Sequence, residues 1–111
     1  MADKCGAVTV LKGEVDVISD GERVKLNQTG NPGMTVGGTG DVLTGIISGL
    51  IAQGIDAFRA AVAGAFISGA SGDLAEVALG YHLTPTDVLE YIPKIMNDPM
   101  CHKAIHEKRL R

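Results

Sequence analysis

The sequence predicts an α/β fold that forms the C-terminal part of a layered α/β/α sandwich. Residues 6–11 are a short β-branched run without polar alternation, which is typical of a strand covered on both faces. A hairpin signal follows at Asp20-Gly21, and three apolar helical segments come after it. Such helices need covering layers, and the chain offers no second buried strand. We therefore expect an incomplete, truncated domain that lacks its N-terminal part.

The predicted hairpin joins residues 14–19 to residues 22–27. Both segments alternate between apolar and polar residues, and Val24 and Leu26 fall on one face. Asp-Gly is a strong signal for a two-residue turn, so the sequence predicts the turn at Asp20-Gly21.

A loop is predicted over residues 28–40 and a nearly all-apolar helix over residues 41–53. Gly54 is expected just after the helix, where a left-handed residue commonly ends it. Gly45 and Gly49 lie four residues apart within this helix, and each costs ~1 kcal/mol relative to Ala. We therefore expect another backbone to pack closely against these two glycines.

A second helix is predicted over residues 57–79. Asp56 precedes it as a good N-cap residue, and Gly80 ends it. The Ala- and Gly-rich stretch 60–70 indicates close burial within this helix.

A third helix begins at Thr84. Thr84 is expected as N-cap, Pro85 as the first helical residue and Asp87 as the partner in a capping box. Pro93 is expected to kink or end the helix. The residues expected to point inward are Val88, Leu89, Ile92 and Ile95.

The composition of the 111 residues excludes several classes of function. With 45% hydrophobic and 21% charged residues, the chain is unlike disordered proteins. A formal net charge of −3 argues against a general polyanion-binding surface. With 4% aromatic residues and no Trp, the chain lacks a stacking platform for single-stranded nucleic acid. We expect no nucleic-acid partner.

Compartment signals point to the cytoplasm. Cys5 and Cys101 lie far apart and outside any metal-ligand spacing, which suits free thiols in a reducing compartment. No secretory signal precedes them. The apolar stretch 42–70 is interrupted at residues 53–56 and at Arg59, so neither piece reaches the ~20 residues that a membrane span needs. We expect a cytoplasmic chain without a membrane partner.

The segment Gly37-Gly38-Thr39-Gly40-Asp41 opens the first apolar helix. The first N–H groups of a helix lack internal partners and carry roughly half a positive charge, so they suit a phosphate. Glycines let an anion approach the backbone closely. The segment has no Lys of a P-loop and no third glycine of a dinucleotide-binding turn.

Asp41 distinguishes this segment from a pure anion site, because its charge would repel phosphate. A carboxylate there suits a site that deprotonates an alcohol beside a phosphoryl group. The alternative is that Asp41 only caps the helix and that the glycines only form a loop.

Two stretches, Thr29-Gly-Asn-Pro-Gly-Met34 and Gly37-Gly-Thr-Gly-Asp-Val-Leu43 with Gly45, resemble the signature of the ADP/ATP-dependent NAD(P)H-hydrate dehydratases, which are ribokinase-like proteins. Leu11-Lys12-Gly13 is similar to a segment of the same family. The resemblance covers residues 6 to about 92. It implies that residues 1–111 are the C-terminal part of a ribokinase-like three-layer α/β/α domain, with a charged tail from about residue 100.

The family's activity, by resemblance, is the return of NADHX and NADPHX to NAD(P)H. The ring hydroxyl would be phosphorylated by ADP or ATP, and phosphate would then be eliminated. The resemblance implies Asp41 as catalytic residue and an anion hole of Gly38, Thr39 and Gly40. The expected nucleotide-binding residues are Lys12, Gly13, Glu14, Val15, Asp16 and Gly40. The expected substrate-binding residues are Asn31, Met34 and Asp41.

Two features separate this chain from the family pattern. Asp16 stands where many members carry Thr, and the N-terminal half with its substrate segment has no counterpart here. His82, His102 and His106 are expected as surface or helix-packing residues. No protein ligands to a metal are evident, and Mg²⁺ is expected on the nucleotide phosphates.

Two other functions compete with the dehydratase. One is a ribokinase-like small-molecule kinase, which the Asn-Pro-Gly-Met loop disfavours. The other is a non-catalytic remnant that binds nucleotide only or folds by oligomerisation, which the short chain favours. We expect a homo-oligomer.

Overall fold

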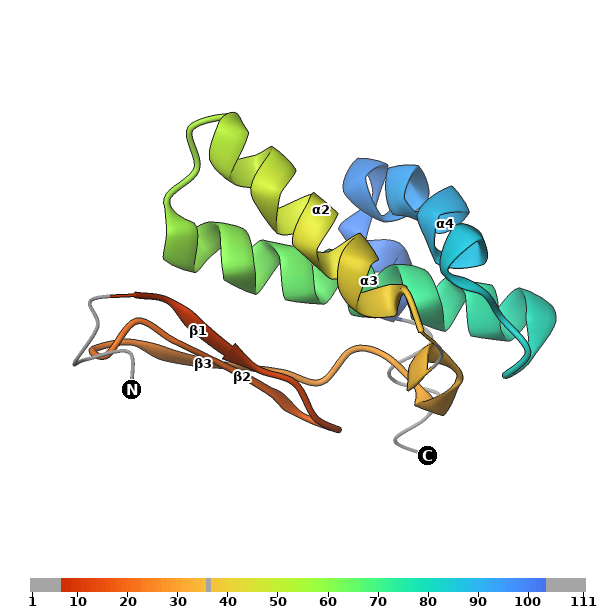
Figure 1. The fold of residues 1–111 in the computed structure, drawn as a ribbon. Helices are drawn as coiled ribbons and strands as arrows, with labels where there is room; N and C mark the ends of the chain where they lie inside the picture. The colour runs from red at the N-terminus through yellow and green to blue at the C-terminus, as the bar shows by residue number, and fades with distance from the viewer. Residues whose placement is uncertain (1–6, 36, 104–111) are drawn as a thin grey trace.

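A computed structural model describes residues 7–35 and 37–103 and confirms a mixed α/β fold (Figure 1). A three-stranded sheet comes first, and helices follow it. In chain order the elements are β1 (Thr9–Leu11), β2 (Asp16–Ser19), β3 (Val24–Asn27), the 3₁₀ turn η1 (Pro32–Thr35), α2 (Thr39–Ala52), α3 (Ala57–Leu79), α4 (Pro85–Asn97) and the 3₁₀ turn η2 (Pro99–His102).

The sheet is antiparallel with the order β1-β2-β3. In Figure 1 the helices lie on one side of this sheet, with α2 and α3 across it. Ile18 in the central strand is fully buried and packs against Leu43 of α2 and Ala61 and Ala65 of α3. A second core cluster, made of Val42, Ala75, Leu83 and Val88, joins α2, α3 and α4.

The opposite face of the sheet is open in the described chain. Leu11, Val24 and Leu26 are 63%, 64% and 56% exposed on it. Leu11 pairs with Val17 and Val17 with Leu26, so they form one apolar row across the three strands. The prediction that the first strand is covered on both faces is therefore wrong for this chain. β1 is an edge strand, and the helices supply one covering layer.

The β2–β3 hairpin is confirmed, but its turn lies one residue later than predicted. Ser19 pairs with Val24, which places Gly21 and Glu22 at the centre of the turn. The Asp20 carboxylate accepts hydrogen bonds from the backbone N–H groups of Glu22 (2.9 Å) and Arg23 (2.6 Å). Asp20 therefore shapes the turn from its first position, and Gly21 takes the positive φ of 96°.

Helix α2 begins two residues before the predicted start and ends before Gly54, whose φ is +94° as expected of the residue that follows a helix. The expectation of close packing at Gly45 and Gly49 is wrong. A Cβ at either position would meet no atom within 4 Å, because both glycines face an open groove between α2 and α4.

The predicted bounds of α3 are confirmed, and so is its close burial. Asp56 caps it by accepting from the N–H of Arg59 at 3.1 Å. A Cβ at Gly64 would stand 2.6 Å from Ile47 of α2. Within the described chain, α3 alone is long and apolar enough to cross a membrane by length and composition, and 56% of its apolar window is buried in the molecule. That burial is the ordinary position of a core helix.

The Thr84–Asp87 capping box of α4 is confirmed, with both of its hydrogen bonds present. Pro93 does not end the helix, since α4 continues to Asn97, and a kink at Pro93 stays a prediction. Proline removes only one backbone hydrogen bond, and the buried Val88 and Ile95 anchor the helix on both sides of it. Leu89 is 51% exposed instead of inward, because it lies on the α2–α4 groove.

Candidate functional site

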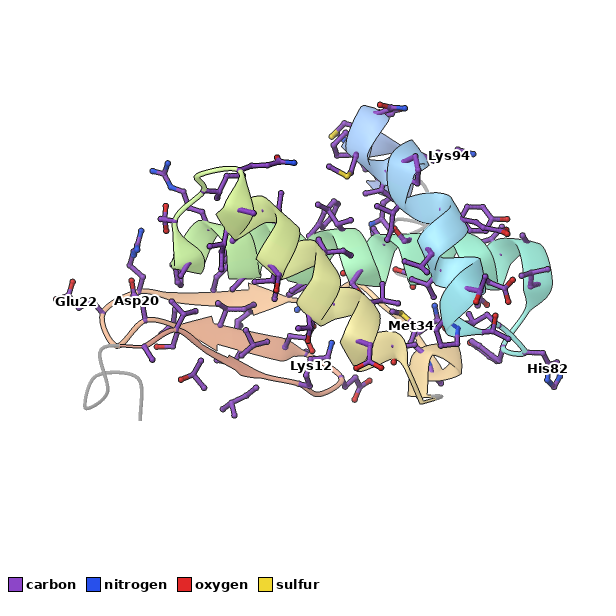
Figure 2. All side chains as sticks on the ribbon, turned by 45° about the horizontal axis from the view of Figure 1, so that its top comes forward. Lys12, Asp20, Glu22, Met34, His82 and Lys94 are labelled. Atoms are coloured by element: carbon purple, nitrogen blue, oxygen red, sulfur yellow. The ribbon has the colours of Figure 1, made fainter. Side chains whose placement is uncertain are left out.

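Three segments meet at the end of the sheet opposite the hairpin turn. They are the turn between β1 and β2, the loop between β3 and α2, and the start of α2. In Figure 2, Lys12 and Met34 lie toward this end, while Asp20 and Glu22 mark the other end. The fold thus brings together the turn between β1 and β2, which carries Lys12, and the glycine-rich loop between β3 and α2.

A cavity of about 690 Å³ lies between these segments, within the size range of small-molecule sites. Its lining includes seven of the predicted site residues: Lys12, Gly13, Glu14, Asp16, Asn31, Met34 and Thr39. It also includes six residues that were not predicted: Gln28, Thr29, Gly30, Pro32, Ser68 and Gly69. Val15, predicted for nucleotide binding, is not in the lining.

The start of α2 carries the segment that the sequence predicts as an anion site. Gly38 is the N-cap residue, with φ of 99° and no side chain to cap the helix. Within the described chain, the N–H groups of Gly40 and Asp41 donate no hydrogen bond. A Cβ at Gly40 would meet no atom within 4 Å. The Thr39 hydroxyl donates to the Met34 carbonyl at 2.7 Å and ties the loop to the helix start.

Asp41 is exposed in the first turn of α2. With Gly38 it lines the groove between α2 and α4, which has a volume of about 580 Å³. Thr39 instead lines the cavity of about 690 Å³ that Lys12 also lines, which we call the lysine-side cavity. The helix start therefore stands between two hollows, with the carboxylate on the groove side and the loop on the cavity side.

Asp16 is buried, and its carboxylate is occupied by the protein itself. It accepts from the Gly13 N–H at 3.2 Å and from the Asn27 side-chain amide at 3.0 Å. Lys12 Nζ lies 3.4 Å away as an ion pair, with the Lys12 side chain 56% exposed. Asp16 thus shapes the turn that carries Lys12 toward the cavity. A direct contact of Asp16 with nucleotide stays a prediction.

Asn31 fastens the loop onto α3. Its side-chain amide donates to the Gly72 carbonyl and to Asp73 Oδ1, both at 3.0 Å, and its Oδ1 accepts from the Gly33 N–H at 3.0 Å. The Met34 sulfur lies directly over Gly72, where any Cβ would collide with it. Both side chains hold the loop in place, and their contact with substrate stays a prediction.

The sequence reasoning missed a buried pair behind the loop. Asp73 of α3 is 0% exposed, and its Oδ2 lies 2.6 Å from His102 Nε2. His102 was expected at the surface or in helix packing, and the structure places it in packing, edge-on to Phe66. The only signal in the sequence is a lone carboxylate within a helix stretch of small residues.

Other predicted residues have simpler positions. His82 is exposed and points away from the molecule (Figure 2). Cys101 is a free cysteine. Cys5, His106 and residues 104–111 of the predicted charged tail lie outside the described residues.

Comparisons with known proteins identify relatives over most of the chain. A family model described as NAD(P)H-hydrate dehydratase matches residues 1–94. The bifunctional NAD(P)H-hydrate repair enzyme of Pyrobaculum aerophilum is 50% identical over 82% of this chain and 18% of its own length. The corresponding enzyme of Archaeoglobus fulgidus is 52% identical over 82% of this chain and 19% of its own.

A shorter relative has a more specific name. The ADP-dependent (S)-NAD(P)H-hydrate dehydratase of Cenarchaeum symbiosum is 46% identical over 86% of this chain and 33% of its own length. The chain therefore spans a third or less of the length of these three relatives.

Proposed function

Because the chain belongs to the NAD(P)H-hydrate dehydratase family, we propose that it contributes to the ADP- or ATP-dependent dehydration of NADHX and NADPHX to NAD(P)H. The observation that carries this proposal is the start of α2. An exposed carboxylate, Asp41, stands there beside backbone N–H groups that the described chain leaves open. That pairing suits transfer of a phosphoryl group to a hydroxyl.

In the proposed reaction, the hydroxyl on the hydrated nicotinamide ring attacks the terminal phosphoryl group of the nucleotide. The bond between this phosphorus and its bridging oxygen breaks, and Asp41 accepts the hydroxyl proton. The N–H group of Gly40, within the predicted anion hole Gly38-Thr39-Gly40, stabilises the charge on the phosphoryl oxygens. Loss of phosphate and of a neighbouring ring proton then restores the ring double bond of NAD(P)H.

The lysine-side cavity and the α2–α4 groove flank the helix start, and we assign one reactant to each. We propose that the nucleotide lies in the lysine-side cavity, where Lys12 is exposed enough to meet its phosphates. The hydrated ring would approach from the groove side, where Asp41 is exposed. The dehydratase named as ADP-dependent supports an adenine nucleotide as the phosphoryl donor.

Mg²⁺ is part of the proposal as a companion of the nucleotide. The ion would take its ligands from nucleotide phosphates and water, and it would supply charge neutralisation during phosphoryl transfer.

A cytoplasmic location and self-association complete the proposal. Free Cys101 suits a reducing compartment. The apolar row Leu11–Val17–Leu26, in which Leu11 and Leu26 are exposed, supports contact with a second copy. We also propose that residues 1–111 represent the C-terminal part of a longer domain, which the partial coverage of its relatives supports.

The first test is recovery of NADH absorbance from NADHX in the presence of ADP or ATP. We expect Asp41→Asn to lower turnover by about 10²–10⁴-fold, the usual contribution of a general base, and to leave nucleotide binding intact. Asp56→Asn is the matched control, because it changes another exposed carboxylate at a helix start. Equal turnover in wild type and Asp41→Asn would remove Asp41 from the mechanism.

The second test addresses the anion hole through nucleotide affinity. A Cβ at Gly40 would meet no atom within 4 Å, so we expect the fold to tolerate Gly40→Leu and the larger side chain to interfere with a ligand. We expect a large loss of ADP and ATP affinity in calorimetry, and no loss in Gly49→Ala, which is equally open on the same helix. Unchanged affinity in Gly40→Leu would contradict the anion-hole assignment.

The same assays separate the competing functions. Phosphorylation of an alcohol without recovery of NADH would favour the small-molecule kinase. Nucleotide binding without either reaction would favour the non-catalytic remnant.

A further inference from the structure

We infer that Asp73 is a positioning residue for the phosphoryl-transfer site, since it sets the loop between β3 and α2 against the start of α2. The inference rests on the proposed function for its catalytic consequence. That one buried carboxylate holds the loop follows from its hydrogen bonds to Gly30 and Asn31.

Asp73 is the point where the loop is fixed to α3. It is 0% exposed, and Oδ2 accepts from the backbone N–H of Gly30 at 3.0 Å. Oδ1 accepts from the Asn31 side-chain amide at 3.0 Å. One carboxylate thus holds both the backbone and a side chain of the loop. A buried carboxylate needs such donors, because an unpaired charge there is costly.

Two further hydrogen bonds connect the loop held by Asp73 to the helix start. The backbone carbonyl of Asn31 accepts from the Met34 N–H at 3.0 Å. The carbonyl of Met34 in turn accepts from the Thr39 hydroxyl at 2.7 Å. Thr39 directly precedes the open N–H groups of Gly40 and Asp41. A shift at Asp73 therefore moves the loop that lines the cavity relative to these groups.

His102 fixes Asp73 from the opposite side. Its Nε2 lies 2.6 Å from Asp73 Oδ2, and its ring is held edge-on against Phe66. His102 belongs to η2, which follows the last helix, so the C-terminal turn and the loop share one anchor. This gives the turn after α4 a role at a site that no residue of η2 lines.

The test compares three variants with wild type. Asp73→Asn removes the charge, Asn31→Ala releases the loop without leaving a new buried charge, and His102→Gln keeps a donor toward Asp73. Asp56→Asn is the control on the same helix, because Asn caps a helix about as well as Asp. Two readouts are taken from each: amide hydrogen exchange at Gly30, and kcat and KM with ADP or ATP as phosphoryl donor.

We expect Gly30 to exchange about tenfold or more faster in Asp73→Asn and Asn31→Ala, while the amides within α3 keep their protection. kcat should fall up to about 10²-fold with a smaller change in KM, since misplaced groups impair the transfer step more than binding. His102→Gln should retain most of both properties, and Asp56→Asn all of them.

Two results would overturn the inference. One is unchanged exchange at Gly30 in Asp73→Asn and Asn31→Ala. The other is a loosened loop with unchanged kcat. If the wild-type chain neither binds nucleotide nor turns over, the proposed function and the catalytic part of this inference both fail. Exchange at Gly30 then decides the structural part separately.

Discussion

The same substitution at two glycines on neighbouring helices should change the free energy of unfolding in opposite directions. Gly69 in α3 lies against Thr29, and a Cβ there would collide with the Thr29 hydroxyl and stand 2.7 Å from its backbone carbonyl carbon. Gly49 in α2 faces open space, with no atom within 4 Å. Gly69→Ala and Gly49→Ala therefore add the same methyl group to two different environments.

The magnitudes follow from two opposing effects. Replacing Gly by Ala in a helix interior gains ~1 kcal/mol. Overpacking costs about 1–3 kcal/mol, and the upper part of that range applies at Gly69 because a backbone atom of Thr29 cannot rotate away. We expect Gly49→Ala to raise the free energy of unfolding by ~1 kcal/mol and Gly69→Ala to lower it by ~2 kcal/mol.

Thermal unfolding measures both changes. For a domain of about this size, 1 kcal/mol corresponds to a change in Tm of about 4–8 °C, so the two variants should melt at clearly separate temperatures. Gly69→Ala should also weaken nucleotide binding, because Thr29 and Gly69 both line the cavity. Equal melting temperatures of the two variants would refute the close approach of the loop to α3.

Three further predictions concern single side chains. The pKa of Asp20 is lowered from 3.8 to about 2 by the backbone N–H groups of Arg23 and Glu22 and by the Arg23 side chain. The stability that these bonds contribute is therefore complete above pH 3.8 and is lost as the pH falls through about 2. A carboxyl NMR titration measures this pKa, and Asp20→Asn should remove the pH dependence of stability that comes from it. Thr84→Ala should cost about 0.5–2 kcal/mol in urea unfolding, because it removes half of a capping box. Ser71→Ala should raise Tm, since the Ser71 hydroxyl is buried and has no hydrogen-bond partner in the described structure; a fall in Tm would indicate a bond to Ser71 Oγ.

Elements governed by neighbours in sequence were predicted well. The ends of α3 and the capping box of α4 depend on Asp56, Gly80, Thr84 and Asp87, which act within one helical turn. The prediction of a phosphate site at the start of α2 rests on the same local reasoning, since helix geometry leaves the first N–H groups without internal partners, and it stays a prediction.

The positions that the sequence did not predict depend on contacts between distant parts of the chain. Gly45 and Leu89 were assigned inward positions, but only the packing of α4 against α2 decides that both face a groove. Asp73 reaches partners 43 residues earlier and 29 residues later in the chain, so no local pattern indicates its role. The amide of Asn31 is turned toward α3 by these same distant contacts.

The sheet face that the described residues leave open makes the melting temperature of this chain depend on what else is in the solution. Any molecule that settles on the row Leu11–Val17–Leu26 binds only the native form, because unfolding separates the three strands. By mass action, each such binder shifts the unfolding equilibrium toward the native state. If a second copy binds there, as proposed, a dilution series followed by calorimetry should show a transition that moves upward with protein concentration.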